Sequence, residues 1–283
     1  MQAVGGPDDR GIGPRALIAR AVAAPPPVWL FFGLLAASML ALVVAPWPLA
    51  AKFHAVVHGL CAQRPSHSFA LGGTNLPFDA RMTGIYGGTL TTLLFLVARG
   101  RWRALRLPSP VIIAVLVLFV VLMGLDGVNS TLQDFRLPYA YEPNNGLRLG
   151  TGLLLGIALG VLVAYLLNAT LWAWGTPARL IEGWGELAGL VAATGGFALL
   201  VASGWGWLYL PLALALVGGA VGVVLTLSLT FLILLYGREN RARRASDVAG
   251  FATAALFLGY AVMALIALGR WYLETTLGIE LPV

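Results

Sequence analysis

Long apolar runs separated by short polar connections dominate the chain. A helix needs about 20 apolar residues to cross a hydrocarbon core of about 30 Å, and seven runs approach or exceed that length. They are approximately Val28–Trp47, Ala80–Ala98, Val111–Leu125, Leu147–Asn168, Leu187–Ser203, Trp207–Tyr236 and Val248–Trp271. The pattern predicts an all-α, polytopic transmembrane helical bundle of about seven spans.

The composition narrows the class further. Hydrophobic residues make up 59% of the chain and charged residues 11%, whereas soluble domains average about 45–50% and about 25%. A single cysteine, Cys61, cannot close an intramolecular disulfide. The net charge of +6 comes from arginines in short blocks beside apolar runs, so it bears on membrane topology and not on nucleic-acid binding.

The basic residues predict an orientation. With the N-terminus inside, twelve lie on the cytoplasmic side: Arg10, Arg15, Arg20, Arg99, Arg101, Arg103, Arg106, Arg179, Arg238, Arg241, Arg243 and Arg244. Six lie outside: Lys52, Arg64, Arg81, Arg136, Arg148 and Arg270. Because cytoplasmic loops carry an excess of Lys and Arg, we expect an N-in, C-out protein of the inner (plasma) membrane.

The chain divides into three expected parts. Residues 1–27, rich in Gly, Pro and Ala, are expected to form a disordered cytoplasmic tail. Residues 28–168 form a four-helix membrane region with polar extracytoplasmic loops, and residues 169–283 a nearly apolar three-helix region. The loops Pro48–Asp79 and Asp126–Gly146 hold all three histidines and the cysteine. A functional site is therefore expected on the outer face of the first four helices.

A short motif occurs twice. Arg81 precedes Thr83-Gly84-x-x-x-Gly88, and Arg148 precedes Thr151-Gly152-x-x-x-Gly156. Small residues four apart let transmembrane helices approach closely. The repeat predicts two similar hairpins whose inward-going helices pack together; the alternative is coincidence in a chain with 35 glycines.

One amphipathic segment could hold a metal ion. If Leu49–Ala62 is helical, His54, His58 and Cys61 form one stripe opposite an apolar face. Imidazole and thiolate are ligands that zinc prefers, and His67 and Asp79 could complete the set. The sequence thus suggests a divalent-metal site. The alternative is that the histidines lie among lipid headgroups and Cys61 is a small buried residue.

The motif region resembles a known family. The stretches Cys61-Ala62-Gln63-Arg64-Pro65-Ser66-His67-Ser68-Phe69 and Asp79-Ala80-Arg81-Met82-Thr83-Gly84-Ile85-Tyr86 are similar to a family of prokaryotic polytopic membrane proteins of unknown function. Its hallmarks are Cys-His-Gln-x-Pro-x-Arg-Ser-Phe and Cys-x-Arg-Cys-x-Gly-Ile-Tyr-x-Gly. A second block of the family resembles residues 124–130 and 148–152. The resemblance spans roughly Phe53–Gly160.

The chain departs from this pattern at four positions. Ala62 stands in place of His, His67 in place of Arg, and Asp79 and Met82 in place of Cys. A thiol-rich site implied by the family would keep one cysteine of three here. Either its ligands have changed to His, Asp and Met, or the cysteines are not essential. The resemblance implies no particular activity.

Arg81 and Arg148 suggest an anion site. Both begin helices whose N-termini point outward, so guanidinium and helix dipole attract the same phosphate or carboxylate, including a lipid headgroup. The full candidate binding set is Arg81, Arg148, Asp79, Asp126, Asn129, Gln63 and Tyr86. The alternative is that Arg81 pairs with Asp79 or Asp126 and only ties the helix ends together.

Three functions fit these features. The first, which we rank ahead, is binding of a small anion or lipid headgroup, extending to transport. The second is a membrane-embedded enzyme at the outer leaflet, with metal or acid–base chemistry from the histidines and Asp79 or Asp126. The third is a structural subunit whose outer loops dock onto other membrane subunits.

Overall fold

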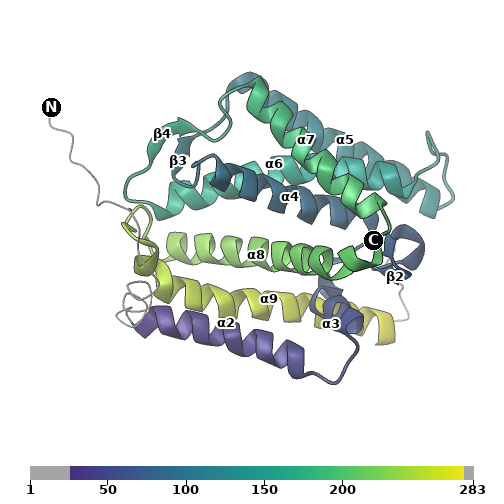
Figure 1. Ribbon diagram of the computed structural model, residues 1–283, viewed down its shortest axis with the longest axis horizontal. Helices are drawn as coiled ribbons and strands as arrows, with labels where there is room; N and C mark the ends of the chain where they lie inside the picture. The colour runs from purple at the N-terminus through teal and green to yellow at the C-terminus, as the bar shows by residue number, and fades with distance from the viewer. Residues whose placement is uncertain (1–25, 277–283) are drawn as a thin grey trace.

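The computed structural model describes residues 26–276, and the predicted tail 1–27 lies outside them except for its last two residues, which begin a helix. Seven helices of at least 19 residues follow one another among the described residues. They are α2 (Pro26–Val44), α4 (Ala80–Ala98), α5 (Pro110–Asp134), α6 (Asn145–Leu171), α7 (Trp184–Ala202), α8 (Tyr209–Leu235) and α9 (Ala249–Thr276). They lie side by side as a single layered bundle (Figure 1). The predicted all-α bundle is confirmed.

Shorter elements connect these helices. They are α3 (Leu49–Val56), β1 (Ala70–Leu71), β2 (Thr74–Asn75), β3 (Ala104–Arg106), β4 (Thr176–Arg179) and the 3-10 turns His58–Leu60, Pro65–His67, Gly206–Leu208 and Ala245–Val248. Strands β1 and β2 pair antiparallel, whereas β3 and β4 pair in parallel.

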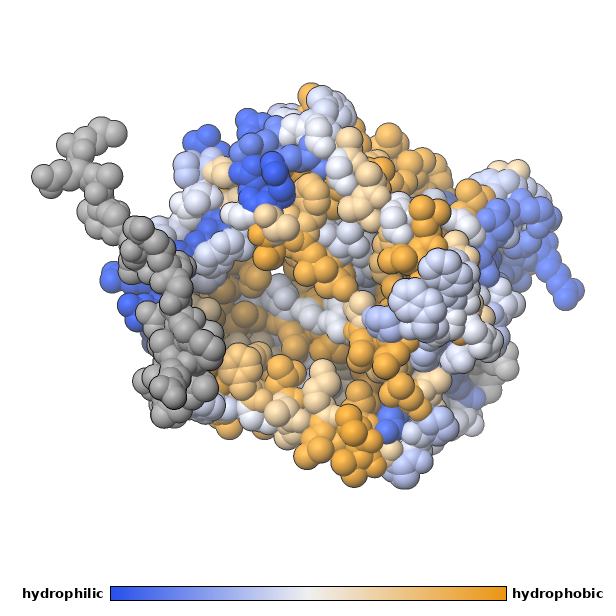
Figure 2. All heavy atoms as spheres, in the orientation of Figure 1, coloured by the Kyte–Doolittle hydropathy of each residue, from blue (hydrophilic) through white to orange (hydrophobic). Residues whose placement is uncertain are grey.

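Six of the long helices in the described part of the chain are apolar enough to cross a membrane: α2, α5, α6, α7, α8 and α9. Hydrophobic groups cover the middle of the face shown in Figure 2, and hydrophilic groups gather at its two ends. Helix α4 is more polar, and its threonines Thr83, Thr89 and Thr92 are buried inside the bundle. These three side chains therefore face other helices and not lipid.

The repeated motif forms the centre of the bundle. A Cβ atom built on Gly88 would lie 2.6 Å from the Leu153 carbonyl oxygen, and one built on Gly156 would lie 2.8 Å from the Gly88 Cα. Only glycine allows helices α4 and α6 to approach this closely. The close packing predicted from Thr-Gly-x-x-x-Gly is therefore observed.

The repeat extends to whole helix–strand–helix units. In sequence order α4, β3 and α5 are followed by α6, β4 and α7. Helix α4 packs on α6, β3 pairs with β4, α5 packs on α6, and α7 packs on α4. Each unit thus covers the central helix of the other, as expected of two similar hairpins.

The two ends of the bundle differ in chemistry. The arginine-rich end, which holds Arg99–Arg106, Arg179 and Arg238–Arg244, is drawn together by the β3–β4 pair and by a hydrogen bond from Arg103 Nη2 to the Arg243 carbonyl. The opposite end, called here the polar-loop end, holds residues 45–79, residues 135–144 and the N-termini of α4 and α6. Both arginine-rich blocks lie at the same end, as expected if successive helices cross the membrane in alternating directions.

The helix expected over Leu49–Ala62 is shorter than predicted. Helix α3 ends at Val56, and a 3-10 turn covers His58–Leu60. Arg270 of α9 donates hydrogen bonds to the carbonyls of His58 (2.7 Å), Cys61 and Ala62 (3.1 Å). These carbonyls are satisfied by a side chain from the far end of the chain, so the segment need not continue as a helix.

The third span is longer than predicted. Helix α5 continues past Leu125 to Asp134 because Asp126, Asn129 and Ser130 are buried against the rest of the bundle. Hydropathy alone placed these polar residues outside the span.

Below the polar loops, Phe53, Leu76 and Phe78 pack in one apolar cluster with Leu153 and Leu216, which holds the loops against α6 and α8.

Candidate functional site

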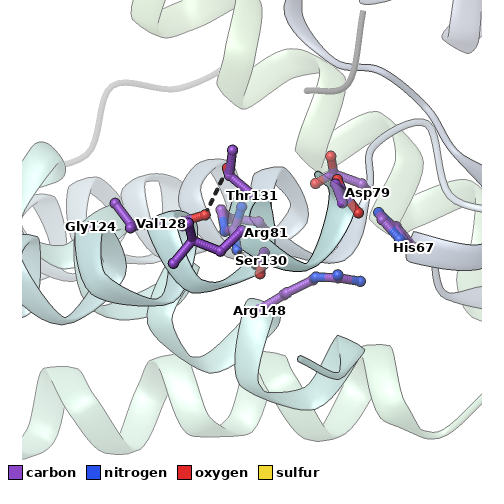
Figure 3. A pocket seen from close by; sticks show the side chains of 11 residues that line it. His67, Asp79, Arg81, Gly124, Val128, Ser130, Thr131 and Arg148 are labelled. Atoms are coloured by element: carbon purple, nitrogen blue, oxygen red, sulfur yellow. Dashed lines mark hydrogen bonds between the residues drawn. The ribbon is translucent and has the colours of Figure 1, made fainter. Parts of the chain in front are cut away.

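A cavity of about 390 Å³ opens at the polar-loop end, where α4, α5 and α6 meet. Ligand pockets commonly measure about 300–1,000 Å³. It is lined by His67, Asp79, Arg81, Gly124, Gly127, Val128, Ser130, Thr131, Leu132, Asp134 and Arg148. Figure 3 shows Arg148 extending toward the side where His67 and Asp79 lie. Three of the predicted binding residues, Arg81, Arg148 and Asp79, therefore line one cavity.

Arg81 is bound to Asp126. Its Nη2 donates hydrogen bonds to Asp126 Oδ2 at 2.7 Å and to Ser130 Oγ at 2.9 Å. The carboxylate, only 1% exposed, also accepts hydrogen bonds from the Tyr141 hydroxyl (2.8 Å) and from Thr151 Oγ1 (3.2 Å). A buried carboxylate is tolerated when it is paired and hydrogen-bonded in this way. The pairing of Arg81 with Asp126, one of the two predicted alternatives, is observed.

Asn129 positions the loop that supplies Tyr141. Its Oδ1 accepts a hydrogen bond from the Ala140 backbone N–H at 2.8 Å, and its Nδ2 donates to the Tyr141 carbonyl at 2.8 Å. Burial and the hydrogen bond to Asp126 raise the pKa of the Tyr141 hydroxyl, so it remains a donor. Asn129 thus acts through the loop and does not line the cavity.

Arg148 has no such partner within residues 26–276. It is only 6% exposed, and within these residues its guanidinium donates a single hydrogen bond, from Nη1 to Asn145 Oδ1 at 3.3 Å. Among the described residues no carboxylate lies within ion-pair distance of it. A buried charge is normally paired because its desolvation is costly. Arg148 therefore presents to the cavity a positive charge that has no ion-pair partner among the described residues.

The other acidic residues of the cavity wall are engaged elsewhere. Asp79 caps α4, where its Oδ1 accepts a hydrogen bond from the Met82 N–H at 2.8 Å. Asp134 pairs with Arg64 at 3.0 Å. Both carboxylates bond to another partner, and neither forms an ion pair with Arg148.

Two further candidates serve the scaffold. Gln63 Nε2 donates to the carbonyls of His54 (2.9 Å) and Pro77 (3.1 Å), which closes the polar loop. Tyr86 packs against Phe78 with ring centroids 4.8 Å apart, next to the apolar cluster. Neither residue lines the cavity.

The predicted metal ligands are spread over several places. Cys61 packs in the apolar cluster with Phe53 and Val57, because the chain turns after α3 and carries the thiol away from the histidine stripe. His58 lies 3.6 Å from Glu274, and His54 contacts the Asn75 carbonyl at 3.5 Å. Within residues 26–276 no group of three or more His, Cys, Asp or Glu side chains is arranged to hold a metal ion.

The Cys61 thiol is expected to be unreactive. Its Sγ accepts hydrogen bonds from the Gln63 and Asp79 N–H groups, at 3.4 and 3.3 Å. Burial, with Asp79 nearby, raises the pKa of the Cys61 thiol to about 12. It therefore stays protonated at neutral pH, and thiolates are the reactive form.

His67 is the histidine that reaches the cavity, and its titration is a test of the local charge. Burial, followed by the positive charges of Arg148 and Arg64, lowers the pKa of His67 below its ordinary 6.5. Since the folded state favours neutral imidazole, stability is expected to fall as the pH drops below about 6.5. We expect a histidine NMR titration to give His67 a midpoint below 6.5, rising in Arg148→Gln. An unchanged midpoint in that variant would contradict the placement of Arg148.

Some cavity residues were not predicted. Ser130, Thr131 and Asp134 come from the last turns of α5, which the hydropathy pattern had assigned to a loop. The spacing of Asp126, Ser130 and Asp134, at i, i+4 and i+8, would have placed them on one helix face. Nothing in the sequence indicates that Arg270 binds the carbonyls after α3.

The bundle and its apolar surface define a multi-pass helical membrane protein. Residues 61–162, which run from within the polar loop into α6, match the family described as predicted membrane protein (DUF2085). An uncharacterized protein of Methanothermobacter thermautotrophicus is 33% identical over 110 residues, covering 38% of this chain and 86% of that protein. The chain belongs to this family of predicted membrane proteins. No solved structure matches it.

Proposed function

We propose that the cavity binds an anionic group, a phosphate or carboxylate carried by a small solute or a lipid headgroup. The observation that carries this proposal is Arg148, a buried guanidinium that faces the cavity without an acidic partner among the described residues. An incoming anion would supply a negative charge beside Arg148 and accept hydrogen bonds from its remaining N–H groups. Planar guanidinium donors match phosphate and carboxylate geometry.

The helices add to this attraction. Arg148 lies in the first turn of α6, which Asn144 caps through a hydrogen bond from the Leu147 N–H at 2.9 Å. The N-terminal ends of helices carry partial positive charge and favour anions. Asp126 pairs with Arg81 and offsets its charge, so the attraction for an anion rests on Arg148 and the helix N-terminus. The proposal is one of binding; helices α4 and α6 are in close contact at Gly88 and Gly156.

The binding test compares two arginines at the same end of the bundle. We expect Arg148→Gln to weaken the binding of inorganic phosphate or glycerol phosphate at least tenfold, because the neutral side chain cannot compensate the anion's charge. Isothermal titration calorimetry of the full chain in an uncharged detergent measures this. The matched control is Arg136→Gln, which neutralises an exposed arginine just beyond α5. Equal affinity of wild type and Arg148→Gln would overturn the proposal.

We further propose that the polar-loop end faces the extracytoplasmic side of the inner (plasma) membrane and that the N-terminus is cytoplasmic. The arginine-rich end supports this orientation, because Lys and Arg are enriched in cytoplasmic loops. Pro27, at the start of α2, shares a pocket with Tyr236 and Asp247 next to the Arg238–Arg244 block, so this helix also starts at that end.

Cysteine labelling tests the orientation. We expect a membrane-impermeant maleimide to label Ala140→Cys in intact cells and to label Glu239→Cys only after lysis. Both positions are exposed, at opposite ends of the bundle. Native Cys61 can stay in place because its buried thiol is protonated. The reverse labelling pattern would show the opposite orientation.

A further inference from the structure

The cavity is longer than an anion requires. Its wall includes Gly124 and Asp134, ten residues apart on α5, and at 1.5 Å per residue this corresponds to about 15 Å along the helix. We propose that the ligand is an anionic membrane phospholipid, with its headgroup at Arg148 and a hydrocarbon chain along α5. This inference rests on the proposed anion site and names the class of its ligand.

The two ends of the cavity differ in polarity. His67, Asp79 and Arg148 lie at the end nearest the polar loops, and Gly124, Gly127 and Val128 form the wall toward the middle of the membrane. Between them Arg81 is already bonded to Asp126 and Ser130. A soluble anion would use only the polar end. A ligand with a charged head and an apolar chain matches both.

Two glycines of α5 leave room for the hydrocarbon chain of the lipid. Cβ atoms built on Gly124 and Gly127 would meet no atom of the described residues within 4 Å, apart from the nearby backbone of α5 itself. They lie three residues apart, so they face nearly the same way and form a shallow groove on α5. These glycines are not needed for close helix packing, in contrast to Gly84 and Gly152 on the central helices.

The groove is open to the bilayer. Helix α5 packs mainly on α6, at the edge of the bundle. Val128, which lines the cavity, is 59% exposed, and Val121 and Leu125 on the same helix are also exposed. A lipid can therefore enter sideways from the membrane without passing through water.

The charge selects among lipids. Arg148 lacks an acidic partner among the described residues, whereas each carboxylate of the cavity wall already has a partner. A headgroup with a net negative charge compensates Arg148, but the choline of a zwitterionic lipid adds a positive charge beside it. Phosphatidylglycerol is therefore expected to bind in preference to phosphatidylcholine.

The test fills the groove and leaves the headgroup site intact. The full chain in maltoside is incubated with equal amounts of phosphatidylglycerol and phosphatidylcholine, and retained lipid is measured by native mass spectrometry. We expect wild type to retain phosphatidylglycerol at least fivefold over phosphatidylcholine, and Gly127→Leu or Gly124→Leu to lose most of that adduct. Both variants should bind glycerol phosphate within twofold of wild type. Gly195→Leu, at an equally open glycine on α7, is the control.

The outcomes separate the two proposals. If the groove variants retain phosphatidylglycerol like wild type while Arg148→Gln still abolishes glycerol phosphate binding, the lipid inference is wrong and the anion site stands. The same holds if wild type retains both lipids equally. If Arg148→Gln changes neither ligand, the anion site fails, and the lipid inference fails with it.

Discussion

Replacing Asp126 with asparagine is expected to destabilise the protein by about 3–5 kcal/mol, the usual cost of breaking a buried ion pair by removing one partner. The change leaves Arg81 without its 2.7 Å carboxylate partner at the inner end of the cavity. It also weakens the contacts of Tyr141 and Thr151, which both donate to Asp126. The free energy of unfolding can be measured by SDS titration in mixed micelles.

Two comparisons make this result specific. Asp134→Asn breaks the ion pair between Asp134 and Arg64, in which both side chains are about 30% exposed. Exposed ion pairs contribute about 0–1 kcal/mol to stability. The double change Arg81→Met with Asp126→Leu removes both charges and should recover much of the loss. If Asp126→Asn is no more destabilising than Asp134→Asn, the pair is not the buried link described above.

The second large effect is expected at the seam between α4 and α6. Replacing Gly84 with alanine would place a methyl group 2.7 Å from the Leu153 nitrogen and 2.9 Å from the Gly152 carbonyl carbon. These are backbone atoms of a packed helix and cannot move aside, so the helices must separate. Overpacking of this kind costs about 1–3 kcal/mol and occasionally more.

Gly150 provides a control of opposite sign. It lies on α6, and a Cβ there would meet no atom within 4 Å beyond its own surroundings in the helix. Alanine in a helix interior is more favourable than glycine by about 0.5–1 kcal/mol. Gly150→Ala should therefore raise the melting temperature in detergent while Gly84→Ala lowers it. Equal shifts in both variants would contradict the close contact at Gly84.

The sequence predicted what the lipid environment imposes. Apolar length located all seven long helices, and the repeat at Gly84 and Gly152 predicted the central contact, because small residues four apart let helices approach closely. The sequence did not reveal contacts between distant segments that share no repeated motif. Arg270 binds the carbonyls of the segment after α3 from more than 200 residues away, and in this segment Cys61 lies in the apolar cluster.

The sequence predicted only part of the candidate site, namely the part that follows from local pattern. Arg81 and Arg148 begin helices that the repeat places together, so their meeting at one cavity follows from local pattern. The histidine stripe depended on a helix continuing to Ala62, and it was lost when that helix ended at Val56. The groove on α5 depends on which glycines are left uncovered, and only the packed structure shows that.

An experimental structure of the protein in nanodiscs containing phosphatidylglycerol tests the central claim most directly. We expect phosphate-shaped density beside the Arg148 guanidinium, with chain density running along α5 past Gly127 and Gly124. The same map of Arg148→Gln should lack both features. An empty cavity in the wild-type map, or one covered by another protein subunit at Arg148, would contradict the account.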